Sequence, residues 1–262
     1  MIYADVHAHL DLFSSEELEG VLERAKEKGV KAIITSGVDV KSNRAALKLA
    51  KSHSISQGIN GIIKAALGIY PTDALKMSDA EIDSELNFIK NNSRTVAAIG
   101  EVGLDYLKSE KKEDREKQKE AFDRQIRLAK ELDKPLVVHS RKAEKEAVEM
   151  LISASAKKAV MHCCMADMKT IKRAADAGLY FSIPALILRS SHFKKLVEVV
   201  PSSRLLTETD APFLSPHQGR KSEPFMITEA VKAIAGIKQI TAEECSKILY
   251  SNYQKLFAET AS

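Results

Sequence analysis

The chain has 262 residues, of which 44% are hydrophobic and 29% are charged. This mixture is typical of a globular protein and excludes disordered, collagen-like and coiled-coil chains. Single-domain α/β barrels run to roughly 250 residues, so one domain can account for the whole length. We find no apolar run of the roughly 18–20 residues that a membrane helix needs, and we expect no membrane partner.

The charge and the cysteines give weaker information about partners and location. The net charge of +4 permits a polyanionic partner but does not demonstrate one, because nucleic-acid binding depends on clustered charge. The first residues carry Asp and His and no basic segment, which is unlike a signal peptide. The three cysteines, an odd number, imply no disulfide framework. We therefore expect a cytoplasmic protein, monomeric and without an obligate protein partner.

Short β-branched runs alternate with segments of helical periodicity along the whole chain. Ser78 is a candidate helix N-cap, and Gly29 a candidate helix stop. The predicted strands are Ile2–His7, Val30–Thr35, Ile62–Ile69, Thr95–Gly100, Pro135–His139, Lys158–His162, Gly178–Ser182 and Arg204–Thr209. The predicted helices are Ser15–Lys28, Ser42–His53, Ser78–Lys90, Glu113–Leu132, Lys142–Ile152, Asp167–Ala177, Ser190–Val199, Pro224–Ala235 and Ala242–Phe257.

This alternation indicates βαβ units and a parallel sheet. Eight such units predict a closed (β/α)8 TIM barrel that forms a single domain over residues 1–262. An open, doubly wound sheet is the alternative architecture.

Histidines and carboxylates stand at the predicted carboxyl ends of the strands. Each alone is more simply a hydrogen-bonded or helix-capping residue. The carboxyl ends of barrel strands meet on one face, so together these side chains predict a metal site. His7 and His9 close the first strand, Glu101 the fourth, His139 the fifth, His162 the sixth and Asp210 the eighth.

The predicted ligands also suggest how many ions are bound. His7 and His9 are two residues apart, so in extended backbone their imidazoles point the same way. Imidazole with carboxylate suits zinc and also accommodates magnesium or manganese. Six ligands exceed the three protein ligands of a one-zinc catalytic site, which indicates two divalent ions with Glu101 bridging them.

Other reactive residues form weaker patterns. Ser140 follows His139 directly, and adjacent strand residues point to opposite faces, so a serine–histidine pair is poorly placed. Cys163 and Cys164 are more simply structural than reactive. The remaining histidines, His53, His192 and His217, are interpreted as solvated or capping residues, with a substrate role for His217 left open.

At these residues the sequence resembles the TatD-type metal-dependent deoxyribonucleases of the amidohydrolase superfamily. The matching segments follow one another in the family's order and extend over most of the chain. They are Asp5-Val-His-Ala-His-Leu10, Gly100-Glu-Val-Gly-Leu-Asp-Tyr106, His139-Ser-Arg141, His162-Cys163 and Thr207-Glu-Thr-Asp-Ala-Pro212.

The resemblance implies a (β/α)8 barrel with a divalent metal centre. It implies that His7, His9 and Glu101 hold one metal, and that Glu101, His139 and His162 hold the second. Asp210 would lie at the metal-activated water as ligand or general base. The resemblance also implies a DNA substrate, often trimmed from the 3′ ends of single strands, with magnesium or manganese required.

The sequence departs from the family pattern around the substrate. Tyr70 stands where the family usually has histidine, within Gly68-Ile-Tyr-Pro71. Cys164 replaces an aromatic residue, and Ser222 an asparagine. The metal ligands are all present, whereas parts of the substrate-binding surface differ.

We therefore predict a metal-dependent phosphodiester hydrolase in which Asp210 orients the attacking water and accepts its proton. Arg141 shares the direction of His139 and either binds phosphate or forms an ion pair with Glu208. Glu208 is expected to support a ligand from behind. Tyr70 is expected to donate a hydrogen bond to a phosphate oxygen. Asp105 and Tyr106 either border the substrate or are structural.

Two other classes of function remain open at this stage. The same metal centre could serve an amidase, lactonase or deaminase that acts on a C–N or C–O bond. A binding or scaffold protein on a degenerate barrel would have lost metal ligands, and this sequence has lost none.

Overall fold

The computed structural model describes residues 1–53, 61–107 and 109–257. Within them, eight strands form one sheet in the order β1 to β8, and all neighbours run parallel. This confirms the predicted (β/α)8 barrel. The strands are β1 (Tyr3–Ala8), β2 (Val30–Ser36), β3 (Ile63–Leu67), β4 (Val96–Asp105), β5 (Leu136–Arg141), β6 (Ala159–Met161), β7 (Tyr180–Pro184) and β8 (Leu205–Glu208).

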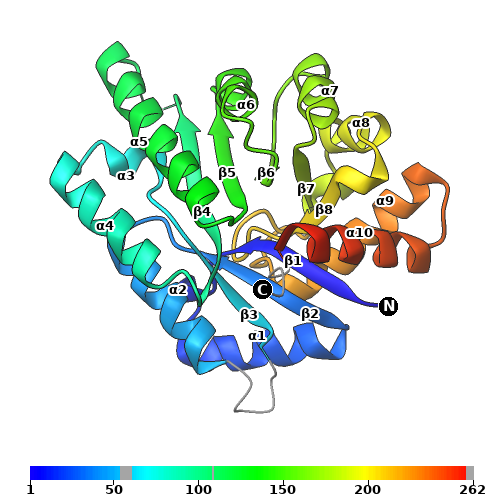
Figure 1. The fold of residues 1–262 in the computed structure, drawn as a ribbon. Helices are drawn as coiled ribbons and strands as arrows, with labels where there is room; N and C mark the ends of the chain where they lie inside the picture. Colours follow the sequence, from blue (N-terminus) through cyan, green and yellow to red (C-terminus); the bar gives the residue numbers. More distant parts are fainter. Residues whose placement is uncertain (54–60, 108, 258–262) are drawn as a thin grey trace.

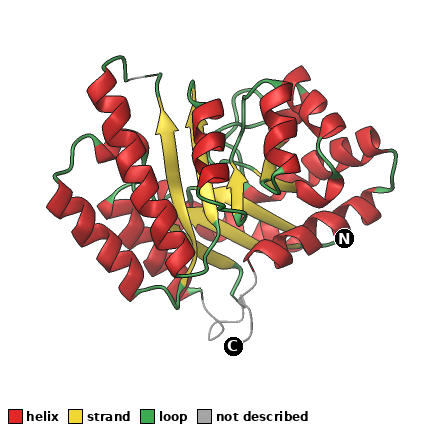
Figure 2. Ribbon diagram, turned by 45° about the horizontal axis from the view of Figure 1, so that its top comes forward, coloured by secondary structure: helices red, strands yellow, loops and turns green. Residues whose placement is uncertain are grey.

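Helices surround the strands, as Figures 1 and 2 show. Ser14 and Ser78 begin α1 and α4 with capping boxes, which satisfy amide donors at the helix starts. The helices are α1 (Ser15–Glu27), α2 (Val40–Ser52), α3 (Pro71–Ala74), α4 (Asp79–Asn91), α5 (Lys112–Glu131), α6 (Glu144–Ser153), α7 (Met168–Asp176), α8 (Ser191–Val199), α9 (Ile227–Lys238) and α10 (Ala242–Phe257). In the described residues no helix is long and apolar enough to span a membrane.

The seam between β1 and β8 closes the barrel at its carboxyl end. Ala8 pairs with Ala211 in a parallel bridge, and the Asp210 amide donates to the His7 carbonyl at 2.9 Å. Asp5, fully buried beneath the seam, accepts hydrogen bonds from the Thr209 amide at 3.0 Å and from the Thr209 hydroxyl. The seam therefore fixes the backbone that carries two predicted ligands.

The interior of the barrel is apolar, and α10 covers its amino end. One buried residue from each strand joins an internal cluster that also includes Leu256 and Phe257 of α10. Ser246 of α10 hydrogen-bonds both backbone atoms of Ile2, just before β1. The strand residues are Val6, Ile34, Ala66, Ala98, Val137, Val160, Tyr180 and Leu206.

Several predicted boundaries are wrong. β4 continues to Asp105, so Glu101 lies in its middle and does not close it. The pairing of β4 with β5 shifts register between Ile99 and Val102, which accommodates this longer strand. β5 likewise extends past His139 to Arg141, and β6 ends at Met161, just before His162. The short helix α3 was not predicted; it begins at Pro71, where proline's fixed φ suits a first helical turn.

Candidate metal centre

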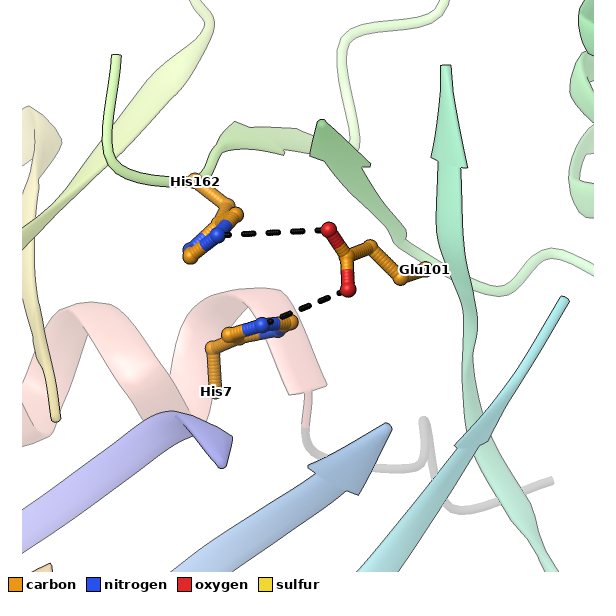
Figure 3. Close-up of side chains that lie close together, drawn as sticks. All are labelled: His7, Glu101 and His162. Carbon is orange, nitrogen blue, oxygen red and sulfur yellow. Dashed lines mark ion pairs between the residues drawn. The ribbon is translucent and has the colours of Figure 1, made fainter. Parts of the chain in front are cut away.

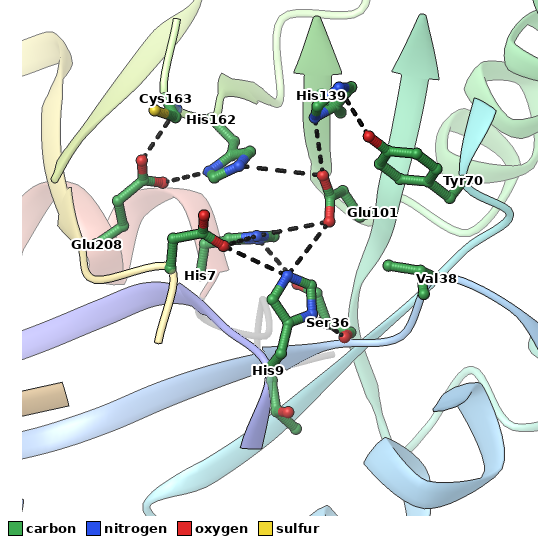
Figure 4. Close-up of polar contacts among 12 residues, drawn as sticks. His7, His9, Ser36, Val38, Tyr70, Glu101, His139, His162, Cys163 and Glu208 are labelled. Atoms are coloured by element: carbon green, nitrogen blue, oxygen red, sulfur yellow. Dashed lines mark hydrogen bonds and ion pairs between the residues drawn. The ribbon is translucent and has the colours of Figure 1, made fainter. Parts of the chain in front are cut away.

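Strand β1 carries His7 and, just past its end, His9, and Ser36 of β2 anchors both rings. The His7 Nδ1 lies 3.1 Å from the Ser36 hydroxyl, and the His9 Nδ1 lies 3.0 Å from the Ser36 carbonyl. A carbonyl can only accept, so the His9 Nδ1–H donates and leaves Nε2 of the neutral ring with a free lone pair. Figure 4 shows this arrangement.

Glu101 lies between two pairs of imidazoles. Its Oε2 is 3.6 Å from the His7 Nε2 and 3.5 Å from the His9 Nε2. Its Oε1 is 3.0 Å from the His139 Nδ1 and 4.0 Å from the His162 Nε2. Figure 3 shows His162 beside one oxygen of this carboxylate and His7 beside the other. Glu101 is thus placed to share its two oxygens between two neighbouring sites.

Asp210 lies two residues beyond β8 and faces the β1 histidines. Its Oδ1 is 3.4 Å from the Nε2 atoms of both His7 and His9. Burial opposes its ionisation, but the close His7 and His9 rings and the charge of His162 hold the pKa of Asp210 well below its usual range. The carboxyl group is therefore ionised at neutral pH.

The pKa of Glu101 is lowered in the same way. Burial raises it, but the charges of His7 and the hydrogen bond from His139 outweigh that effect. The centre therefore holds two carboxylates in their charged form.

Glu208 lies behind His162 and orients it. Its Oε2 is 2.8 Å from the His162 Nδ1 and also accepts from the Ser182 hydroxyl, while its Oε1 accepts from the Cys163 amide at 2.9 Å. Burial lowers the pKa of His162, but the Glu208 carboxylate outweighs it and raises that pKa to about 10. The predicted alternative, an ion pair between Arg141 and Glu208, is not formed: Arg141 has no ion pair among the described residues.

On the opposite side, Tyr70 and Asp105 hold His139. The Tyr70 hydroxyl donates to the Asp105 Oδ2 at 3.1 Å and lies 3.0 Å from the His139 Nε2. The one proton of this hydroxyl is therefore engaged by Asp105, whereas the prediction from the sequence was a hydrogen bond to a phosphate oxygen.

Two glutamines of α5 fix the backbone of this side, and neither was predicted from the sequence. Gln118 pairs with both backbone polar atoms of Asp105, at 2.8 and 2.9 Å. Gln125 does the same for Ile69, at 2.7 and 3.1 Å. Their seven-residue spacing on one helix face was the available signal, but a buried glutamine carries no chemical mark in a sequence.

The donor set fits divalent cations. The donor atoms form two groups, and within each group all atoms lie within 4.8 Å of one another. The first group is His7, Glu101 and His162, and the second is His7, His9 and Asp210. The His7 Nε2 is buried and has no hydrogen-bond partner in the described structure, which is costly for a polar atom unless something binds there. His139 belongs to neither group; its ring nitrogens contact Glu101 and Tyr70.

The other reactive residues of the sequence have different surroundings. His53 ends α2, His192 contacts the Cys164 carbonyl at 3.0 Å, and His217 pairs with Glu229 at 2.9 Å. All three cysteines are free, and Cys164 is buried.

Comparisons with known proteins agree with this geometry. The family model for TatD-related DNases matches residues 4–258. An uncharacterized metal-dependent hydrolase of Methanocaldococcus jannaschii is 36% identical, covering 97% of this chain and 96% of that protein. The human deoxyribonuclease TATDN3 is 32% identical, covering 97% of this chain and 93% of that protein.

Solved structures share the barrel fold of this chain. The crystal structure of YJJV, a TatD homolog of Escherichia coli, matches with a TM-score of 0.86 at 26% identity, covering 98% of each chain. A 5-methylcytosine deaminase of Klebsiella pneumoniae shares the fold at a TM-score of 0.64 and 12% identity. The match to the family model over residues 4–258 places the chain in the TatD-related DNase family.

Proposed function

We propose that the protein hydrolyses phosphodiester bonds of DNA, trimming single strands from the 3′ end with two divalent metal ions. One observation carries the metal requirement: the donor atoms of five predicted ligands gather around the buried His7 Nε2, which has no hydrogen-bond partner among the described residues. The deoxyribonuclease name of the human relative supports the choice of DNA.

The six predicted ligands divide into two sets. We assign His7, His9 and Asp210 to one ion and His162 with His139 to the other, with Glu101 shared between them. Magnesium, manganese and zinc all suit such a set of imidazoles and carboxylates. When bound, the ions supply a water of lowered pKa and stabilise the charge that develops on the phosphate.

The chain's own residues complete the reaction. Asp210, ionised and facing the centre, orients the attacking water and accepts its proton. Arg141 lines the opening of the site without an ion-pair partner among the described residues, and we assign its planar guanidinium to the phosphate oxygens. Glu208 keeps the Nε2 of His162 directed at the centre by holding Nδ1.

The proposal includes a cellular compartment and an oligomeric state. The three free cysteines favour a reducing compartment such as the cytoplasm. We propose a monomer, because the site is built from strands of one barrel.

The test is cleavage of a single-stranded DNA oligomer labelled at either end, with manganese or magnesium present. Stepwise shortening from the 3′ end, abolished by a chelator and by Asp210→Asn, is the expected result. A metal-loaded protein that leaves DNA intact but hydrolyses small amides or lactones would assign it instead to C–N or C–O bond hydrolysis.

A further inference from the structure

Two cavities flank the metal centre, and both border His139, Arg141, His162 and Asp210. The first, which we call the Asp11 cavity, has a volume of about 460 Å³. The second, the Met165 cavity, has a volume of about 600 Å³. Either is large enough for a ligand of nucleotide size. A strand that is cut at the centre must therefore place one nucleotide on each side of the cut.

The two cavities differ in charge. The walls of the Asp11 cavity carry Asp11 and Asp73 beyond the metal ligands, whereas the Met165 cavity carries Lys142 and Glu144. Asp73 is neutralised by Lys76 at 2.6 Å. The Asp11 cavity is thus the more acidic of the two, and a continuing chain of phosphates fits the Met165 cavity better.

Asp11 has a carboxylate oxygen that lacks a hydrogen-bond donor. Its Oδ1 is buried and has no hydrogen-bond partner in the described structure, and it forms no ion pair there. A carboxylate oxygen without a donor is costly, and a turn of the Asp11 carboxylate toward the cavity that it lines would let a ligand hydroxyl supply that donor. Leu12 and Phe213, 50% and 52% exposed, line the same cavity and offer apolar surface to a base.

We propose that the Asp11 cavity binds the 3′-terminal nucleoside and that Asp11 accepts a hydrogen bond from its free 3′-hydroxyl. This rests on the proposed nuclease function and assigns its substrate end. The rest of the strand crosses the Met165 cavity, with Arg141 between the two at the scissile phosphate.

The chemistry is a simple hydrolysis with balanced atoms. The water oxygen forms a bond to the phosphorus of the terminal nucleotide. The bond from that phosphorus to the 3′-oxygen of the preceding nucleotide breaks, and this oxygen leaves with a proton. The products are a nucleoside 5′-monophosphate and a strand shortened by one nucleotide, which again ends in a hydroxyl.

With this arrangement the enzyme should discriminate between DNA strands that end in a 3′-hydroxyl and strands that end in a 3′-phosphate. A 3′-phosphate would place negative charge against Asp11 and remove the hydroxyl donor, so the site rejects it. We expect a kcat/KM at least about tenfold lower for an oligomer ending in 3′-phosphate than for one ending in 3′-hydroxyl. Asp11→Asn removes the repulsion and keeps an acceptor oxygen, so this preference should fall to about threefold or less.

The experiment compares both oligomers with the metal-loaded wild type, Asp11→Asn and Glu144→Gln. Glu144→Gln removes the same charge from the Met165 cavity, so the terminal preference should persist whatever happens to the rate. The preference is a ratio within one preparation, and a general loss of folded or metal-loaded enzyme does not alter it.

The outcomes separate this inference from the proposed function. DNA cleavage with equal rates for both termini, or a preference unchanged in Asp11→Asn, overturns the assignment of Asp11 and leaves the nuclease intact. No cleavage of any DNA overturns both. If Asp11→Asn does not fold, inhibition of DNA cleavage by the wild type tests the proposal instead. Thymidine 5′-monophosphate should inhibit at least about tenfold better than thymidine 3′,5′-bisphosphate. Equal inhibition by the two compounds contradicts the proposal.

Discussion

The two ends of this barrel differ in the polarity of the side chains that they bury. The amino end is apolar: Leu256 and Phe257 of α10 belong to one buried cluster with a side chain from each of the eight described strands. The carboxyl end buries imidazoles and carboxylates, and the His7 Nε2 there has no hydrogen-bond partner among the described residues. Apolar burial stabilises the folded state, whereas buried polar groups without partners cost free energy. The contrast indicates that the amino end holds the fold while the carboxyl end serves a ligand.

The backbone shows the same division. At the amino end, Asp133, Ser155 and Gln239 take positive φ where α5, α6 and α9 end, which is a common way to terminate a helix. At the carboxyl end, the non-glycine residues with positive φ border the Met165 cavity, and none of them directly follows a helix of the described structure. They are Lys142, Cys163, Asp210 and Leu214, with φ between 41° and 57°. Such conformations persist only where the surroundings impose them, and they cluster at functional sites.

The largest expected effect is at the carboxyl end. Asp210→Asn should lower kcat by roughly 10³-fold or more, because it removes both a charged ligand and the proton acceptor. The variant should remain folded, because the Asp210 side chain lies outside the apolar clusters of the core. The measurement is steady-state cleavage beside a melting curve.

Asp133→Asn is the matched control at the amino end. Asp133 is exposed and pairs with Lys158 at 2.7 Å, so the same substitution there should leave kcat unchanged. Near-normal turnover of Asp210→Asn would remove this residue from the chemistry and erase the functional contrast between the two ends.

The second prediction concerns the amino end, where a substitution should lower the stability and leave the activity unchanged. Phe257→Ala should lower the free energy of unfolding by about 3 kcal/mol, because it opens a cavity under the barrel. The kcat of the protein that remains folded should match the wild type. Val199→Ala, at a side chain 43% exposed, should change the stability little. A loss of kcat per folded molecule in Phe257→Ala would show that the two ends are coupled.

Topology explains why the sequence predicted so much of the site. Parallel strands of a barrel bring their carboxyl ends to one face, so His7, His139 and Asp210 converge although they lie far apart in the chain. The alternation of the backbone places His7 and His9 on the same side. These rules need no knowledge of side-chain packing.

Other features depend on packing and escaped prediction. Glu101 enters from the middle of β4 because that strand continues to Asp105, and no residue type marks the register shift that permits this. Ser36 anchors two histidines through one hydroxyl and one carbonyl, but a serine at a strand end is unremarkable in a sequence. Arg141 was a candidate partner for Glu208, and only the geometry identifies His162 in its place.

A third, smaller effect concerns the support of His162. Glu208→Gln removes the charge that holds the His162 Nδ1–H and should weaken metal binding about 10–100-fold. The measurement is calorimetric titration with manganese or zinc. Glu85→Gln is the matched control, because Glu85 is equally buried and pairs with Arg44 away from the centre. It should alter stability without altering metal affinity, and equal losses in both variants would contradict a specific role for Glu208.

The most diagnostic effect is the pH dependence of metal binding. In the metal-free protein the pKa of His162 is raised to about 10, and those of His9 and His139 lie above their usual 6.5. Metal ligation needs neutral imidazole, so binding releases protons, and the affinity should rise with pH between about 6.5 and 10 by up to about tenfold per unit for each proton released.

The stability of the metal-free protein should move in the opposite direction over the same range. A folded-state pKa above the unfolded value gives stability that is fully present below pH 6.5 and lost as the pH rises through about 10. Metal-free protein should therefore melt at lower temperature as the pH rises, while metal-loaded protein gains relative to it. Titrations and melts at several pH values measure both slopes. If neither quantity changes with pH, the imidazoles are not protonated in the metal-free centre, and the electrostatic contrast between the two ends of the barrel is weaker than these contacts imply.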